Sequence, residues 1–344
     1  MPDRMAASRG VIQLRISRWA ALAVLLFCGA SLACSPARSS PEEAARSSPP
    51  APAPPAAQTG GFDGSRAWGY LEKIVGFGPR PPASPNIRRE QQYLASQLRS
   101  FGCPVTQDHF HAQTDLGTLE MDNIIAKIPG RNPGIVLFLS HYDTLRLPGF
   151  VGADDGGSST ALLLEMARVL CAHPRPLTVW IAFLDGEEDQ ENFATAYQAQ
   201  TTWSDNNSTF GSRELAASMD NSGDLKRIKA VLLADMVGDA SLDVTRDSNS
   251  TPWLEDMVWS AAKRTGFSRY FLHTSMSVYD DHMPFIQRHV PAADVIDFDY
   301  PYWHTVNDTL DKCSPHSLAV VGYVLLETLQ ELDHKFAPGP RQGK

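Results

Sequence analysis

Polar side chains stand at or near the ends of four apolar segments of the chain, and their types suit catalysis at a metal ion. The residues concerned are His141, Asp155, Glu187, Glu188, Asp235 and His304. Carboxylate and imidazole ligands without a thiolate favour zinc or another borderline divalent cation. Two consecutive acids can face different directions at the end of a strand, so Glu188 could bind a metal while Glu187 stays free as a base.

These residues need a scaffold that brings distant parts of the chain together. The four apolar segments have the continuous hydrophobic character of strands buried on both faces, and they span 135–140, 177–184, 229–236 and 292–298. Segments with helical spacing alternate with them, at 158–170, 211–219, 253–265 and 314–332. This alternation predicts an α/β fold: a single globular domain with a central, mainly parallel mixed sheet and helices on both faces. The carboxyl ends of such strands border one crevice, so we expect one shared site.

The composition of the 344-residue chain excludes one class of partner. Asp and Glu number 39 against 30 Lys and Arg, which gives a formal net charge of -9. A phosphate backbone requires a basic surface, so nucleic acid is not an expected partner. Hydrophobic residues make up 43% of the chain, which is enough for a sizeable core.

The N-terminus has the pattern of an export signal. Several arginines precede an apolar run from Trp19 to Ala30, which is too short to span a bilayer. Residues 1–33 are therefore a predicted signal peptide. The sequence Ser31-Leu32-Ala33-Cys34 resembles a bacterial lipoprotein signal, in which Cys34 would carry the lipid; an ordinary cleaved signal is the alternative. We expect an exported protein, periplasmic or at the cell surface, that meets the membrane only through this lipid anchor.

The rest of the chain divides by composition into three parts. Residues 34–60 are rich in Pro, Ala and Ser and predict an extended spacer. Residues 61–338 form the predicted catalytic domain, and 339–344 form a short tail. We expect the domain to be a monomer.

Cysteine usage predicts a fold held together by its core. The cysteines within the expected domain are Cys103, Cys171 and Cys313. Because three is an odd number and no Cys-x-x-Cys pair occurs, at least one thiol should be free, and a disulfide framework is not expected. A domain of this length can be stable through apolar burial alone.

The motifs together resemble the zinc-aminopeptidase (M28-like) superfamily, which includes the animal-type glutaminyl cyclases. The matching motifs are His141-x-Asp143, Gly152-Ala153-Asp154-Asp155, Asp185-Gly186-Glu187-Glu188, Asp235 and His304-Thr305. Three stretches are similar to the cyclases in particular: Trp203-Ser204 with 210–217, Asp280-Asp281-His282-Met283-Pro284-Phe285, and Trp303-His304-Thr305. The paired aspartates and the two tryptophans discriminate best between cyclases and aminopeptidases.

The resemblance implies roles at the metal. One zinc ion per chain would be held by Asp155, Glu188 and His304. Glu187 matches the general acid and base. His141 matches a histidine that binds a second metal in the aminopeptidases but not in the cyclases.

The resemblance also implies the surroundings of the reacting groups. Asp235 and Asp280 match acids that form hydrogen bonds near the catalytic glutamate. Trp203 and Trp303 match aromatic walls of the substrate pocket, although simple packing beside the histidine ligand is an alternative role for Trp303.

The chain departs from the animal cyclases in three places. Those enzymes have a disulfide beside the site, and its two positions are Ser140 and Thr160 here, so that bond is absent. Extra residues rich in Gln, Ala and Thr lie within Asp189–Thr202. Two further acids, Asp297 and Asp299, precede the last motif and are expected near the mouth of the pocket.

The activity that the resemblance implies is that of a glutaminyl-peptide cyclotransferase, which converts the N-terminal glutamine of peptides or proteins to pyroglutamate with release of ammonia. Zinc would polarise the amide carbonyl, and Glu187 would move a proton from the attacking amine to the leaving nitrogen. The alternative is a dizinc aminopeptidase, in which Asp155 bridges two metals and Glu187 activates water. A metal-free binding module is a third class, which the presence of Glu187 disfavours.

Overall fold

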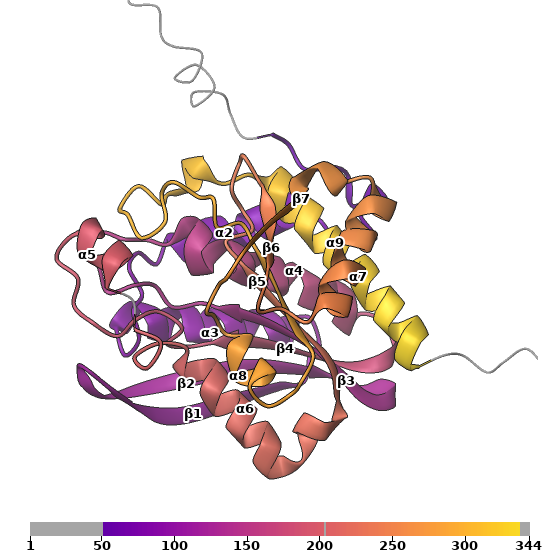
Figure 1. Ribbon diagram of the computed structural model, residues 1–344, viewed down its shortest axis with the longest axis horizontal. Coiled ribbons are helices and arrows are strands. Elements are labelled where there is room, and N and C mark those ends of the chain that lie inside the picture. The colour runs from indigo at the N-terminus through magenta and orange to yellow at the C-terminus, as the bar shows by residue number, and fades with distance from the viewer. Residues whose placement is uncertain (1–50, 203, 338–344) are drawn as a thin grey trace, which may run out of the picture. The chain divides into compact units, whose positions relative to one another are not determined.

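An eight-stranded mixed sheet forms the centre of the domain in the computed structural model, which describes residues 51–202 and 204–337 (Figure 1). The strands are β1 (Val105–Thr114), β2 (Gly117–Ile128), β3 (Gly130–His141), β4 (Arg175–Leu184), β5 (Ile228–Asp235), β6 (Val244–Asp247), β7 (Phe271–Met276) and β8 (Ala292–Ile296). The helices are α2 (Gly64–Val75), α3 (Pro85–Ser100), α4 (Ser159–Cys171), α5 (Ala196–Thr201), α6 (Phe210–Ser222), α7 (Pro252–Thr265), α8 (Met283–Ile286) and α9 (Pro315–Phe336).

The sheet is parallel at its centre and contains antiparallel pairs towards both edges. The strand order is β1-β2-β4-β3-β5-β8-β6-β7. β3 pairs in parallel with β4 and β5, and β5 with β8. β1, β2 and β4 pair antiparallel in turn. The predicted mainly parallel mixed sheet is therefore confirmed, although the short elements α5, β6, β7 and α8 were not expected.

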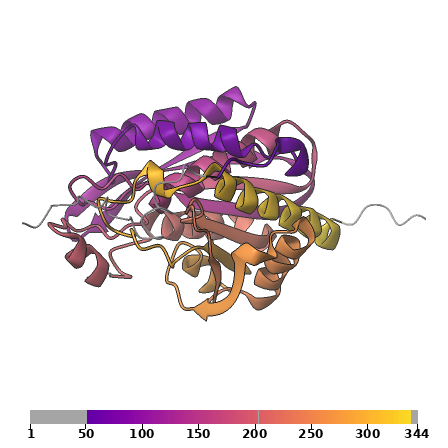
Figure 2. The same ribbon diagram turned by 90° about the horizontal axis from the view of Figure 1, so that it is seen from above.

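Helices lie on both faces of the sheet (Figure 2). Side chains of the central strands alternate between two cores, one on each face. Val136 and Phe138 of β3 belong to the core that α2, α3, α4, α7 and α9 cover. Leu137 and Leu139 belong to the core on the other face, under α6 and α8. Because both faces are buried, the strand sequences are continuous apolar runs.

Helix ends follow local capping rules in the segments that lead to the site. The carboxylate of Asp63 accepts the backbone N–H groups of Ser65 and Arg66 at the start of α2. Ser84 caps α3 by accepting the N–H of Ile87 at 3.2 Å, with Pro85 in the first turn.

None of the helices in the described residues combines the length and the apolar character needed to cross a bilayer.

Two of the three cysteines of the domain form a single disulfide, which was not predicted from the sequence. Cys103 and Cys171 are joined by a disulfide, with their Cα atoms 5.4 Å apart. Cys103 follows α3 and Cys171 ends α4; the two helices are neighbours, so tertiary packing joins cysteines 68 residues apart. Cys313 is buried and is the cysteine without a disulfide bond in the described part of the chain, which confirms the expected free thiol.

The last ten residues of the predicted spacer lie against the domain. Residues 51–60 contact the domain: Thr59 is fully buried, and Ser314 Oγ donates to the carbonyl of Ala51 at 3.2 Å. Pro and Ala predict no core of their own, but they pack against a surface that distant residues supply. The predicted signal and most of the spacer, at 1–50, and the tail at 339–344 lie outside the described residues.

Candidate active site

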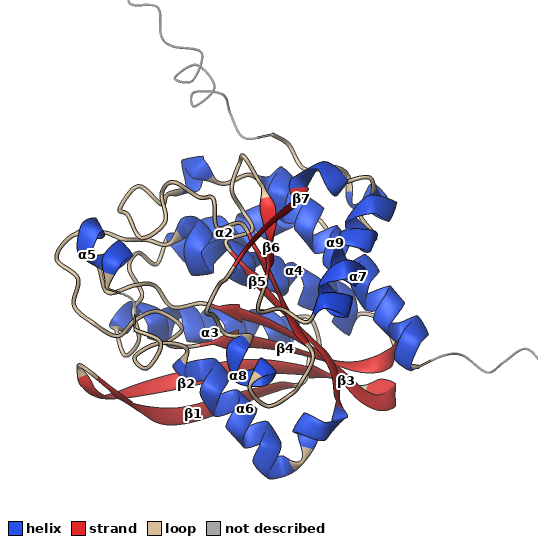
Figure 3. Ribbon diagram, viewed as in Figure 1, coloured by secondary structure: helices blue, strands red, loops and turns tan. Residues whose placement is uncertain are grey.

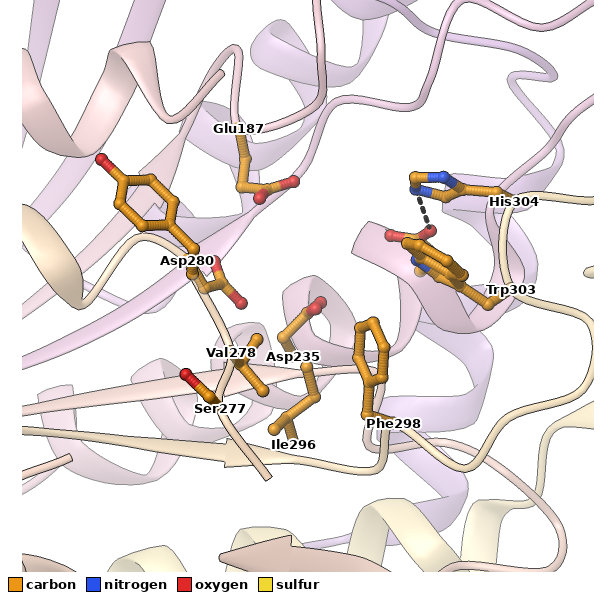
Figure 4. A pocket seen from close by; sticks show the side chains of 11 residues that line it. Glu187, Asp235, Ser277, Val278, Asp280, Ile296, Phe298, Trp303 and His304 are labelled. Atoms are coloured by element: carbon orange, nitrogen blue, oxygen red, sulfur yellow. Dashed lines mark ion pairs between the residues drawn. The ribbon is translucent and has the colours of Figure 1, made fainter. Parts of the chain in front are cut away.

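A cavity of about 220 Å³ opens beside the carboxyl ends of β5 and β8 (Figure 4). Its lining is acidic on one side and aromatic on the other, and it consists of Asp155, Glu187, Asp235, Ser277, Val278, Tyr279, Asp280, Ile296, Phe298, Trp303 and His304. In Figure 4, Glu187 and Asp280 lie opposite His304 and Trp303, with Asp235 between them. The lining contains the predicted site residues that the structure describes except Glu188, which lies behind it, 3.1 Å from His304. Trp203 lies outside the described residues.

Asp155, Glu188 and His304 form a compact group that could hold a metal ion. One ligand atom from each lies within 4.8 Å of the others, and all three residues are buried. Nε2 of His304 lies 3.1 Å from Glu188 Oε2 and 3.6 Å from Asp155 Oδ2. These two carboxylate oxygens are buried and accept no hydrogen bond from the described residues. Two buried oxygens and one ring nitrogen facing a common point suit a cation of the zinc type.

The tautomer of His304 supports this assignment. Its Nδ1 lies 2.9 Å from the carbonyl oxygen of Ala199, which can only accept, so Nδ1 carries the proton. In the neutral ring Nε2 is then a lone-pair donor that faces the carboxylates of Asp155 and Glu188. Burial alone would lower the pKa of His304, but the Glu188 and Asp155 charges outweigh burial and raise that pKa to about 9. A cation that binds Nε2 therefore replaces a proton there.

The backbone before α4 places Asp155. This residue interrupts the turn Ala153–Ser158, with φ -73° and ψ 104°, and Gly156 follows with φ +78°. A Cβ on Gly156 would lie 2.7 Å from the carbonyl oxygen of Asp143, so only glycine fits there. The carboxylate of Asp308 accepts the N–H groups of Asp154 and Asp155, at 2.9 and 3.2 Å, and fixes the turn from the other side.

The loop after β4 separates the two adjacent glutamates. Gly186 has φ +74°, and Asp143 accepts the N–H of Glu187 at 3.1 Å and that of Glu188 at 3.4 Å. Glu188 Oε1 accepts the N–H of Leu145 at 3.0 Å, which leaves Oε2 for the metal. Glu187 instead lines the cavity.

Burial and neighbouring charge make Glu187 a strong candidate for a proton carrier. Burial raises the pKa of Glu187 well above its usual value, and the Asp280 charge raises it further. Burial and the charge of Asp235 in turn raise the pKa of Asp280 to about 7. A carboxyl group whose pKa is raised holds a proton more readily than a free one, which suits general acid–base catalysis.

His141 joins a second group of possible ligands. Its Nε2 lies 3.0 Å from Asp235 Oδ1 and 3.3 Å from Asp155 Oδ1. His141, Asp155 and Asp235 meet the same geometric criterion as the first group and share Asp155 with it. The side-chain arrangement alone is therefore compatible with one metal or two.

Several residues that shape the site were not assigned a role from the sequence. Asp143 and Asp308 hold the ligand-bearing loops, and Tyr300 donates its hydroxyl to Asp308 at 2.7 Å. Val278 and Phe298 line the cavity. Asp308 lies four residues after His304, and this spacing is the only signal for it in the sequence. Its partners, Asp154 and Asp155, belong to a distant loop and could not be inferred.

Ser140 and Thr160 occupy the positions of the disulfide found in the animal enzymes. They lie side by side here, with their hydroxyl oxygens 3.3 Å apart. The expected position of Asp297 and Asp299 at the mouth of the pocket is wrong. Asp297 is not at the pocket mouth, because its buried carboxylate accepts the N–H of Asp243 at 2.7 Å. Asp299 is exposed and is not part of the cavity lining.

Comparisons with known proteins agree with this geometry. The model of peptidase family M28 matches residues 123–329. The chain is 30% identical to the glutaminyl-peptide cyclotransferase-like protein of Mus musculus, over 79% of this chain and 76% of that protein. It is 39% identical to the glutaminyl cyclase of an Acidobacteriales bacterium, with a TM-score of 0.73 over 84% of this chain and 98% of that one. A Zn-dependent exopeptidase from Parabacteroides distasonis is 28% identical, with a TM-score of 0.70 over 78% and 98% of the two chains.

Proposed function

The chain belongs to peptidase family M28, and we propose that within this family it is a glutaminyl-peptide cyclotransferase. Its substrates are peptides or proteins with an N-terminal glutamine, and its products are the pyroglutamyl chain and ammonia. The observation that carries this proposal is the small cavity in which Glu187, Asp235 and Asp280 face Trp303 beside the metal group. The identities to a bacterial glutaminyl cyclase and to a murine cyclase-like protein support it.

Residues of the cavity have distinct tasks in this reaction. The Glu187 carboxylate takes a proton from the α-amine, whose nitrogen then attacks the side-chain amide carbon of the same glutamine. Glu187 returns the proton to the amide nitrogen, which leaves as ammonia. When zinc is bound by Asp155, Glu188 and His304, it supplies Lewis-acid stabilisation of charge on the amide oxygen.

The aromatic wall fits a small amide side chain. Trp303 stacks on the His304 ring, with the centroids 4.0 Å apart, and it also lines the cavity with Phe298. These two contacts support both roles considered for Trp303 from the sequence, which are packing beside the metal ligand and bounding the substrate space. Apolar walls here exclude water, which would otherwise compete with the amine for the carbonyl carbon.

We propose one zinc ion per chain. The ring of His141 is hydrogen-bonded to Asp235 at 3.0 Å, so these two buried side chains satisfy each other without a second metal ion. Elemental analysis of His141→Ala should then show the same single zinc as the wild type, whereas His304→Ala should lose it. Two tightly held zinc ions in the wild-type protein would favour the aminopeptidase.

We also propose that the protein is exported and lipid-anchored at Cys34. The Cys103–Cys171 disulfide supports export, because such bonds persist in oxidising compartments. Mass spectrometry of the mature protein should find a lipidated Cys34 as the first residue. A free N-terminus at another residue would exclude the lipoprotein form.

The direct test of the activity uses two peptides that differ only in the first residue. Purified, zinc-loaded protein should release ammonia from the peptide that begins with glutamine and leave the peptide that begins with leucine intact. Liberation of free leucine, without ammonia from the first peptide, would assign the chain to the aminopeptidases instead.

A further inference from the structure

The extra residues within Asp189–Thr202 lie against the proposed zinc site. They include the short helix α5, which stands among loops at the left of the view in Figure 3. Two of their side chains, Phe193 and Ala199, are 4% and 2% exposed. Tyr197 on the same helix is 76% exposed. The segment therefore has a buried side that faces the domain and an exposed side.

Two hydrogen bonds join α5 to the metal-binding loop. The carbonyl oxygen of Ala199 accepts Nδ1–H of His304 at 2.9 Å. Gln200 Nε2 donates to the carbonyl oxygen of Trp303 at 2.7 Å. His304 has φ +53°, a left-handed conformation that a non-glycine residue adopts only when its surroundings hold it there. The two bonds supply part of that restraint.

Apolar contacts join the same segment to a second metal ligand. A small satellite core beside the site consists of Leu145, Leu147, Phe150, Phe193 and Ala199. The backbone N–H of Leu145 donates to Glu188 Oε1 at 3.0 Å. The Phe150 ring meets the His304 ring edge to face, with the centroids 6.3 Å apart. Phe193 also donates its N–H to the Arg146 carbonyl at 3.2 Å, so the segment is tied to the loop beneath Glu188.

We propose that Asp189–Thr202 is a positioning element for zinc, acting through Ala199 on His304 and through the satellite core on Glu188. This inference rests on the proposed zinc site. The bond to Ala199 keeps the proton on Nδ1, so that Nε2 presents its lone pair to the metal, and it raises the basicity of the ring. Phe193 is the side chain that anchors the segment, and it touches neither the substrate cavity nor the metal group.

The test compares two aromatic residues of the segment. Phe193→Ala should raise the zinc dissociation constant about 10- to 100-fold, the range seen when the outer partners of metal ligands are lost. Tyr197→Ala, the matched control, should stay within about twofold of the wild type, as expected of an exposed substitution. The measurement is competition between the zinc-free protein and a fluorescent chelator, with circular dichroism to show that each variant is folded. Phe193→Leu should restore most of the affinity.

Two results would overturn the inference. One is a folded Phe193→Ala protein that binds zinc as tightly as the wild type. If that variant does not fold, residues 192–200 are replaced by a short Gly-Ser linker instead. The second contradicting result is that this protein binds zinc as tightly as the wild type. A wild-type protein that binds no zinc would instead contradict the proposed zinc-dependent function itself, so the two failures are distinguishable.

Discussion

Glu187 and Glu188 are adjacent in the chain, yet their surroundings give them different chemistry. Glu188 has one oxygen fixed by the Leu145 N–H and the other directed at His304. Glu187 lines the cavity, where Asp280 and burial keep its pKa high. The sequence indicated this division of roles, because consecutive acids at a strand end can diverge. The structure adds the cause, which is the left-handed Gly186 and the two N–H bonds to Asp143.

Removal of the Asp280 charge should shift the pH dependence of catalysis. Glu187 must be ionised to act as a base, so kcat/KM should rise as pH increases through the pKa of Glu187. The negative charge of Asp280 raises that pKa. Asp280→Asn should therefore move the acidic limb of the kcat/KM profile to lower pH, and lower the maximal rate less than loss of Glu187 does. The assay is the pH profile of glutamine cyclisation. A limb that moves to higher pH, or does not move, would refute the proposed coupling between the two acids.

At the scale of elements, a buried arginine ties α3 to the loop that carries Asp155. Arg80 and Glu90 are both fully buried, and Arg80 Nε lies 2.9 Å from Glu90 Oε2. The guanidinium also donates to the carbonyl oxygens of Tyr142, Val151 and Gly152. One cation thus satisfies three carbonyls of the segment that leads to Asp155.

Loss of this cation should be costly. Burial raises the pKa of Glu90 to about 8 even beside Arg80, so the loss from Arg80→Met is greatest above that pH, where Glu90 is a buried charge without its partner. Breaking such a pair costs about 3–5 kcal/mol. The free energy of unfolding in urea should fall by that amount. The double variant Arg80→Met/Glu90→Gln is the control and should recover part of the loss, since no charge is then left unpaired. A double variant no more stable than the single one would show that the lost carbonyl contacts, not the unpaired carboxyl group, account for the destabilisation.

The sequence predicted the central strands and long helices because their patterns are local. The runs at 135–140 and 177–184 lie within β3 and β4, and the helix expected at 253–265 matches α7. The short elements were missed because tertiary contacts determine them. α5, for example, ends an insertion that packs on the satellite core, and β6 meets β8 through the single pair Thr245 and Ile296.

The sequence predicted which residues form the site, but not the contacts that hold them in place. The acids and histidines at strand ends gave six of the residues that meet there. Asp308 lies 153 residues from Asp155 in the chain, so no local pattern shows that it holds the ligand loop. The disulfide has the same origin, since only the packing of α3 beside α4 brings its two cysteines together.

At the scale of the whole molecule, the disulfide should contribute to stability. It closes a loop across 68 residues, and a native bond of this kind typically contributes about 2–4 kcal/mol. Cys103→Ser combined with Cys171→Ser should lower the free energy of unfolding by that amount, measured with urea. Reduction of the wild type with dithiothreitol is the matched control and should give a similar loss. Reduced and oxidised wild-type protein with the same unfolding midpoint would show that the bond contributes nothing.

The proposed mechanism requires that Glu187 carries the proton and that Glu188 binds zinc. One variant tests this assignment most directly. Glu187→Gln keeps the size of the side chain and removes the base, while Asp155, Glu188 and His304 stay intact. Zinc content and turnover of a glutamine-initiated peptide are measured on the same preparation, with Glu188→Gln as the matched control. We predict that Glu187→Gln retains one zinc ion and loses about 10²–10⁴-fold in turnover, whereas Glu188→Gln loses zinc and activity together. A Glu187→Gln protein that loses its zinc, or that cyclises the peptide at a near-normal rate, would contradict the account.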